Sequence, residues 1–143
     1  MSLNLVKLCV GVTTIEELAD WISSLRDPSG KPREQVHTTR MIPRRMDELL
    51  DGGSLYWVIK GNVQVRQRLL DVRPFRGDDG IERCHLVLDR ELVPTFWQPR
   101  RAFQGWRYLE ADDAPPDLAR AEGEQLAEMP AKMRRELAEL GLI

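Results

Sequence analysis

The sequence predicts an α+β fold, in which a small β-barrel or strongly curved sheet of about five or six strands carries a helix near each terminus. Short apolar segments follow one another closely between residues 54 and 109, separated by turns that contain glycine. An amphipathic helix is predicted before them, at residues 15–25, and a helical stripe of leucine and methionine after them. A further short helix is expected directly before the central hairpin.

The N-terminal part of the chain predicts a strand followed by a helix. Leu3–Val10 has the apolar content of a strand. Thr14 and Glu17 then match a capping box, in which each side chain bonds the backbone N–H of the other residue. Apolar residues keep helical spacing up to residue 25, and residues 27–30, with the sequence DPSG, predict a loop.

The segment before the central hairpin predicts a strand and a short helix. Glu34–Met41 contains several β-branched residues, which favour a strand. Pro43 indicates a helix start, because a proline at the first helical position loses no hydrogen bond. Gly52 and Gly53 indicate where that helix ends.

The central hairpin is the clearest β signal. Ser54–Lys60 predicts a strand, Gly61 and Asn62 a tight turn because both residues tolerate positive φ, and Val63–Val72 the returning strand. The alternation of apolar residues in the returning strand slips by one position near Gln67. This slip predicts a β-bulge at that residue.

Three further strands are predicted at Ile81–Leu88, Leu92–Trp97 and Phe103–Leu109. A helical tail is predicted from about residue 115 to 141, and its apolar stripe consists of Leu126, Met129, Met133, Leu137 and Leu140. This stripe is expected either to dock on the core or to form an interface with a protein partner or a second copy. Residues 1–143 are expected to form a single domain, with the barrel core at about 33–109.

Composition is typical of a globular protein of the cytoplasm. The chain is 42% hydrophobic and 31% charged, with no apolar run of the ~20 residues that a membrane span needs. Its first residues lack the basic leader and cleavage site of a signal peptide, so cytoplasmic localisation is expected. Cys9 and Cys84 lie in apolar stretches, which favours free buried thiols over a disulfide.

Charge is distributed unevenly along the chain. Residues 33–107 carry fourteen basic and ten acidic side chains, whereas residues 108–143 carry four and nine. All but one of the basic residues in the middle segment are arginines, which bind phosphates with a planar fork of donors and stack on aromatic rings. The net charge of −2 therefore favours recognition at one face or pocket over indiscriminate capture of nucleic acid.

Several stretches of the chain resemble one bacterial family. They are TTRMIPRR at residues 38–45, ELLDGGSLYWVIKG at 48–61, QRLLDVRP at 67–74, RRAFQGWRYL at 100–109 and LVKLCVG at 5–11. These motifs are similar to those of the domain of unknown function 1489, which is known mainly from alphaproteobacteria. The resemblance runs over nearly the whole chain, and it implies no established activity.

A second resemblance concerns the fold. A strand rich in threonine and arginine, a short helix ending in LLDGG and a basic hairpin are similar to the pattern of PUA-like domains, including their ASCH and EVE branches. The final FQGWRY at residues 103–108 is similar to the closing strand of EVE-type members. This resemblance implies a PUA-like barrel of about five or six strands that binds RNA or a modified nucleobase.

Binding is the function that the sequence favours, with RNA or a nucleotide-like ligand as partner. Arginines neutralise phosphates while aromatic rings stack on bases. The predicted ligand-binding residues are Arg40, Arg45, Lys60, Arg66, Arg68 and Trp106. The structural alternative is that the tryptophans fill the core while the arginines solvate the exterior.

Two other functions are weighed against binding. Some ASCH-type proteins are small amidohydrolases, so the resemblance implies a hydrolase of modified nucleosides with Lys60 and Thr39 as catalytic candidates. A protein–protein adaptor that uses the terminal helix is the third option. No cofactor or metal is predicted: Cys84 and His85 are adjacent and would point to opposite faces of a strand, and His37 has no ligand at a metal-binding spacing.

Overall fold

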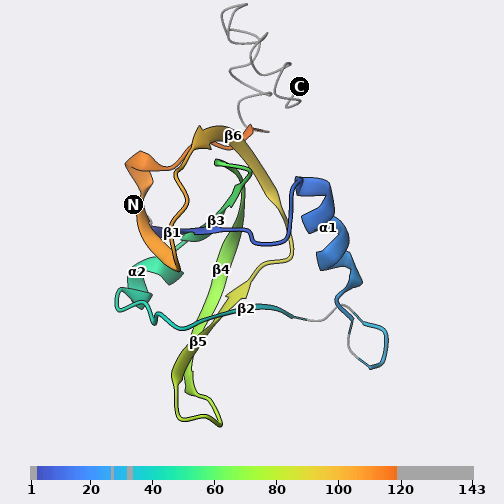
Figure 1. The fold of residues 1–143 in the computed structure, drawn as a ribbon, viewed down its shortest axis with the longest axis vertical. Coiled ribbons are helices and arrows are strands. Elements are labelled where there is room, and N and C mark those ends of the chain that lie inside the picture. The colour runs from blue at the N-terminus through green and yellow to red at the C-terminus, as the bar shows by residue number, and fades with distance from the viewer. Residues whose placement is uncertain (1–2, 27, 32–33, 119–143) are drawn as a thin grey trace, which may run out of the picture.

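The computed structural model describes residues 3–26, 28–31 and 34–118, which form a mixed sheet of seven strands with two short α-helices (Figure 1). The strands are β1 (Leu3–Leu8), β2 (Gln35–Thr39), β3 (Ser54–Ile59), β4 (Asn62–Arg76), β5 (Glu82–Leu88), β6 (Val93–Pro99) and β7 (Trp106–Glu110). The helices are α1 (Ile15–Ser24) and α2 (Met46–Leu50), and a 3₁₀ turn, η1 (Ala111–Asp113), follows β7.

The predicted barrel of five or six strands is wrong. The strand order is β2-β5-β4-β3-β1-β7, with β6 pairing β4 off this path, and the end strands β2 and β7 do not pair with each other, so the sheet is not closed. The N-terminal strand β1 lies between β3 and the edge strand β7, parallel to β3 and antiparallel to β7. Parallel pairing of strands far apart in sequence leaves no local signal, whereas the hairpins do.

The helix signals succeed in part. Thr14 caps α1, because its side chain accepts a hydrogen bond of 3.1 Å from the backbone N–H of Glu17, which is one half of the predicted capping box. The other half is not formed within the described residues, where the Glu17 carboxylate accepts from the Thr13 hydroxyl. The second helix begins at Met46, three residues later than Pro43 suggested, and turns out of the helix at Gly52, whose φ is +86°. The C-terminal helical tail predicted from about residue 115 falls almost entirely outside the described residues.

The central hairpin is confirmed, but its turn and its bulge lie elsewhere. Lys60 and Gly61 take the positive φ values of the turn, +49° and +80°, and Asn62 already belongs to β4. The strand β4 is 15 residues long, and its register shifts at Gln64 and at Leu70. Gln67 lies between the two bulges in regular pairing, so its neighbours Arg66 and Arg68 share one side of the strand.

Core packing divides between the two faces of the sheet. The larger cluster lies on the inner face, where Leu18 and Ile22 of α1 cover the sheet, and a smaller cluster around Val58 lies on the opposite face. The sheet curls, since the ring of His37 on β2 contacts that of Trp57 on β3 although these strands are not neighbours. Figure 1 shows α1 at one side of the strands and the β4–β5 hairpin projecting away from them.

No helix within residues 3–26, 28–31 and 34–118 has the length and apolar content needed to cross a membrane.

Candidate ligand cavity

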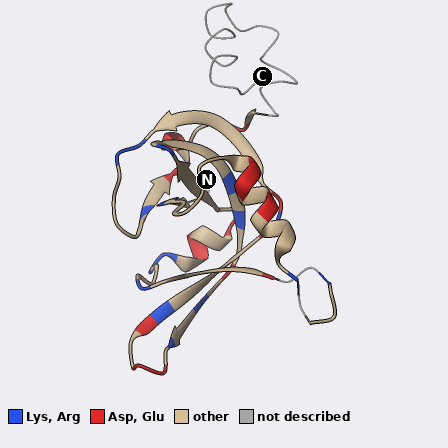
Figure 2. Cartoon of the chain, turned by 45° about the vertical axis from the view of Figure 1, so that its right-hand side comes forward, with Lys and Arg blue, Asp and Glu red and all other residues tan. Residues whose placement is uncertain are grey.

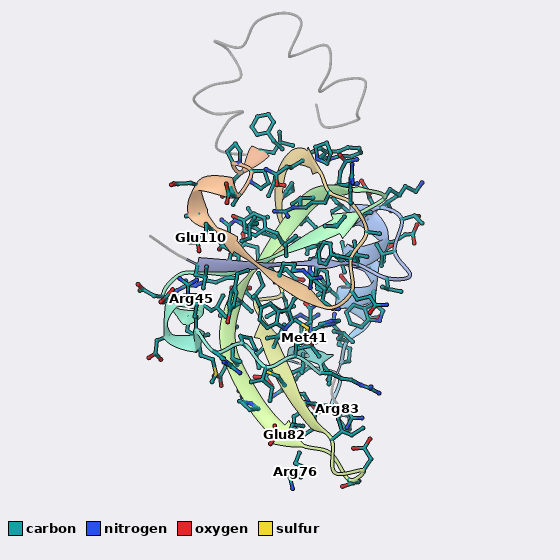
Figure 3. All side chains as sticks on the ribbon, turned by 60° about the vertical axis from the view of Figure 1, so that its left-hand side comes forward. Met41, Arg45, Arg76, Glu82, Arg83 and Glu110 are labelled. Atoms are coloured by element: carbon teal, nitrogen blue, oxygen red, sulfur yellow. The ribbon has the colours of Figure 1, made fainter. Side chains whose placement is uncertain are left out.

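Arg45 and Trp106, which were predicted to bind a ligand, both make contacts within the protein. Arg45 bonds Glu48 and Glu110, and its guanidinium lies 5.5 Å from the centre of the Tyr108 ring (Figure 3). Trp106 is 5% exposed, and its indole N–H donates to the carbonyl of Met41 at 2.7 Å. Both side chains thus hold the segment around α2 against β7.

The two catalytic candidates lie on different parts of the sheet. Lys60 is exposed at the tip of the β3–β4 hairpin, whereas Thr39 is buried at the end of β2, opposite Cys84 of β5. Neither residue lines the two cavities described below. Arg40 is exposed directly after β2.

Arg66 and Arg68 are the only pair of predicted residues that the structure aligns on one side of a strand. Arg66 donates two hydrogen bonds to the carboxylate of Asp117, at 2.8 and 2.7 Å, and a third to the Ser54 hydroxyl at 3.0 Å. Arg68 is exposed. Figure 2 shows that basic residues are otherwise spread over the β4–β5 hairpin, the segment before α2 and the loop after β6. The described residues therefore do not gather the predicted arginines into one face.

A cavity of about 480 Å³ lies instead between α1, the end of β1 and the start of β2. This volume falls in the range of small-molecule sites, roughly 300–1,000 Å³. The walls combine apolar surface with a few polar groups. Their lining includes the side chains of Lys7, Cys9, Trp21, Gln35, His37 and Trp57.

His37 is the polar group that the cavity leaves unsatisfied. Its Nε2 is buried and has no hydrogen-bond partner among the described residues. Burial, together with the nearby positive charge of Lys7, lowers the pKa of His37 to about 4, so the ring is neutral at pH 7. A neutral imidazole has one nitrogen that donates and one that accepts, and leaving either unpaired in the interior costs about 1–3 kcal/mol. A ligand with a hydrogen-bonding edge would remove that cost.

Lys7 supplies the positive charge of the cavity. Strand alternation places it on the inner face with Leu3 and Leu5, opposite Trp57 of β3. Burial lowers the pKa of its ammonium group, and within the described part of the chain that group makes no ion pair or hydrogen bond. An ammonium group without a partner beside a cavity favours an anionic or carbonyl-bearing ligand.

Cys9 is a poor nucleophile in this position. Burial raises the pKa of its thiol to about 11, so the thiolate that would react is scarce at neutral pH. The residue instead contributes apolar surface next to Lys7.

A buried amide network holds the wall of the cavity. Gln67, fully buried on β4, accepts a hydrogen bond of 2.8 Å from the indole N–H of Trp57 and donates to the amide oxygen of Gln35 at 2.7 Å. It also donates to the backbone carbonyl of Asp89 at 2.8 Å. His37 packs edge-on against Trp57, with ring centres 5.2 Å apart, so its position depends on this network.

Two exposed apolar side chains belong to the cavity lining. Trp21 on α1 is 50% exposed and Val10 in the loop after β1 is 87% exposed. An indole that presents half its surface next to a cavity offers a face on which a planar ligand can stack.

Sequence reasoning missed this cavity although its signals were present. Lys7 is the one charged residue within the predicted strand Leu3–Val10, and Trp21 is the only aromatic residue of the predicted helix 15–25. The sequence pattern of His37 was informative only about metal binding, for which it has no ligand at a suitable spacing. Its placement beside Lys7 depends on the curl of the sheet, which no local pattern encodes.

Within residues 3–26, 28–31 and 34–118, no three side chains of His, Cys, Asp or Glu gather where they could hold a metal ion.

Comparisons with known proteins give one match. Neither the curated proteins nor the solved structures contain a match to this chain. A family model described as "Protein of unknown function (DUF1489)" matches residues 5–143, a range that includes both the cavity and the hairpin. The chain therefore belongs to the DUF1489 family of proteins of unknown function.

Proposed function

We propose that this chain is a binding domain for a small planar ligand of the nucleotide or modified-base kind, held in the cavity between α1, β1 and β2. The observation that carries the proposal is the unpartnered Nε2 of His37, which lies in the same cavity as the Lys7 ammonium group.

Three side chains of the cavity, those of His37, Lys7 and Trp21, match parts of such a ligand. The neutral ring of His37 can bond the edge of a base, which presents both donors and acceptors. Lys7 can pair with a phosphate, and the exposed face of Trp21 can stack on the ring. Stacking of a base on an aromatic side chain contributes roughly 1–3 kcal/mol.

The size of the cavity favours a small ligand over an RNA strand. About 480 Å³ accommodates one nucleotide, and the arginines expected to track a phosphate backbone are spread over several elements. The two best-placed of these, Arg45 and Arg66, already bind carboxylates of the chain itself.

Hydrolysis of a modified nucleoside is the competing function. It would have to use Lys7, because Lys60 and Thr39 do not line the cavity and Cys9 stays protonated. Glu17 lines the cavity, but its carboxylate accepts a hydrogen bond from Thr13 and makes none with Lys7 within the described residues. If Lys7 acted as a general base, it would need a hydrogen-bonded partner that orients it. Binding is therefore the better-supported function.

Isothermal titration calorimetry with the four ribonucleoside monophosphates and the four matching nucleosides tests the proposal. Trp21→Ala should weaken binding of both series roughly tenfold or more, since both lose the stacking face. Leu70→Ala is the matched control, because Leu70 is 52% exposed but lies on β4 outside the cavity.

Lys7→Gln separates the phosphate from the base. It should weaken the monophosphates while leaving the nucleosides nearly unchanged, and Lys60→Gln, which removes an exposed lysine elsewhere, should change neither series. The proposal fails if no member of either series binds, or if Trp21→Ala and Leu70→Ala behave alike. Conversion of a nucleoside, followed by liquid chromatography, would instead establish the hydrolase.

A further inference from the structure

A second cavity, of about 470 Å³, lies on the opposite face of the sheet. Asn4, Ser54, Tyr56 and Arg66 form its floor, and the segment 111–117 closes its side. Tyr56 belongs to the smaller core cluster. This cavity and the His37 cavity have no lining residue in common.

The floor of this cavity is rich in hydrogen-bond donors. The guanidinium of Arg66 is the central one, with its side chain 24% exposed. The amide oxygen of Asn4 accepts a bond of 2.9 Å from the backbone N–H of Ser54, which leaves its N–H groups as donors. Burial raises the pKa of Tyr56, so its hydroxyl keeps its proton. Donors of this number around one guanidinium match the acceptors of an oxyanion.

One carboxylate of the chain itself meets these donors. Asp117 receives both hydrogen bonds of the Arg66 fork and is 27% exposed. The backbone of its segment bonds β6 at a bridge between Thr95 and Asp117 and through a bond of 3.0 Å from the Phe96 N–H to the Pro116 carbonyl. The neighbouring Pro115 and Leu118 are buried, whereas the side chain of Asp117 is partly exposed. A ligand would therefore have to displace this one side chain and not the whole segment.

The pair Asp79–Arg83 shows that two hydrogen bonds from a guanidinium to one carboxylate do not by themselves mark a binding site. Arg83 donates two bonds to Asp79, at 2.9 and 2.7 Å, the same pattern as Arg66 with Asp117. This pair lies at the end of the β4–β5 hairpin (Figure 3), and its residues line neither cavity. Of these two arginines, Arg66 combines the paired bonds to a carboxylate with a hollow lined by further donors, and Arg83 does not.

We propose that the Arg66 cavity is an oxyanion-binding site that the chain occupies with its own Asp117, and that the phosphate or carboxylate group of a ligand replaces this side chain when it binds. The site is independent of the function proposed for the His37 cavity. Binding there would separate the carboxylate of Asp117 from Arg66 beside the bridge of Asp117 to Thr95, so occupancy of the cavity and the position of Asp117 are coupled.

Thermal unfolding of the full chain with inorganic phosphate, at constant ionic strength, tests this site. The variant Asp117→Ala empties it, and its Tm should rise saturably by about 4 °C or more with phosphate. The unsubstituted chain should respond much less, because Asp117 competes. Arg66→Gln combined with Asp117→Ala should abolish the response, and Asp79→Ala should create none.

Acetate in place of phosphate tells which oxyanion fits, and a response to either one supports the site. If Asp117→Ala does not fold, Asp117→Asn keeps the shape of the side chain and serves in its place. In addition, amide NMR of the unsubstituted chain should show shifts at Thr95, Phe96 and Asp117 at high phosphate. The proposal is overturned if the Asp117 variants respond to neither anion, or if their response survives the loss of Arg66.

Discussion

The His37 cavity and the Arg66 cavity differ in how completely their polar groups are paired. On the α1 side, the Nε2 of His37 and the ammonium group of Lys7 have no hydrogen-bond or ion-pair partner among the described residues. On the opposite face, each of the three guanidinium nitrogens of Arg66 donates a hydrogen bond, two to Asp117 and one to Ser54. Volume does not distinguish them, since both measure close to 500 Å³. Pairing does: the first cavity is open to a ligand, whereas a ligand of the second must displace a side chain.

The largest expected effect concerns the wall of the open cavity. Gln67→Leu leaves the Trp57 indole, the Gln35 amide and the Asp89 carbonyl without their partner. At about 1–3 kcal/mol for each buried unsatisfied group, we expect the free energy of unfolding to fall by about 3–5 kcal/mol. Urea denaturation measures it.

Gln98→Leu is the matched control for that substitution. Gln98 is partly exposed and its amide donates one bond, to the carbonyl of Asp113. If the two variants lose the same stability, Gln67 does not hold the wall.

The next effect is a dependence of stability on pH. The pKa of His37 is lowered from 6.5 to about 4, so between these values the unfolded chain binds a proton that the folded chain does not. The free energy of unfolding should therefore fall by about 3 kcal/mol as pH decreases through that window. His37→Phe, which preserves ring packing on Trp57, should remove this loss.

Denaturation at several pH values resolves that difference. His85→Phe retains His37 and should retain the loss. Equal pH profiles for the chain with and without His37→Phe would show that this histidine is not buried in its neutral form.

A smaller effect tests the self-occupied cavity. Asp117→Ala leaves the partly buried guanidinium of Arg66 unpaired, at a cost of about 1–2 kcal/mol, since both side chains keep about a quarter of their surface exposed. Asp79→Ala breaks an equally well-formed pair in which the aspartate side chain is 48% exposed, so water can take the place of the carboxylate and the loss of stability should be smaller. The reverse order, measured by urea denaturation, would contradict the account of this cavity.

The smallest effect on stability is expected at the mouth of the open cavity. Trp21 exposes half its surface, so Trp21→Ala should lower the free energy of unfolding by only about 1 kcal/mol or less while it weakens ligand binding. A large loss of stability, measured in the same denaturation series, would mean that Trp21 belongs to the core and is not a ligand-stacking residue.

Local signals in the sequence specify much of the secondary structure. The N-cap Thr14 gives the start of α1, and Gly52 takes the positive φ of +86° that turns the chain out of α2. The positions of β3 and of most other strands follow from apolar segments between turns. These features depend on neighbours within a few residues, which a single sequence displays.

The sheet topology and the site depend on distant pairings instead. The parallel pairing of β1 with β3 joins residues 5–8 to 55–58. Neither segment contains a pattern that predicts this pairing. The same pairing sets Lys7 beside Trp57, and the curl brings His37 to both. The predicted binding residues were mostly arginines, because arginine is abundant in the middle segment. Composition does not show that Arg45 and Arg66 already bind carboxylates of the chain itself.

The central claim is that the cavity between α1, β1 and β2 binds a nucleotide-like ligand, and an NMR titration of the ¹⁵N-labelled chain with a ribonucleoside monophosphate tests it most directly. The account predicts saturable shifts of the backbone amides from Lys7 to Val12, of His37 and of the Trp21 indole N–H, with little change at Arg40, Arg68 or Lys60. Shifts confined to those three basic residues, or no shifts with any of the four monophosphates, would contradict it.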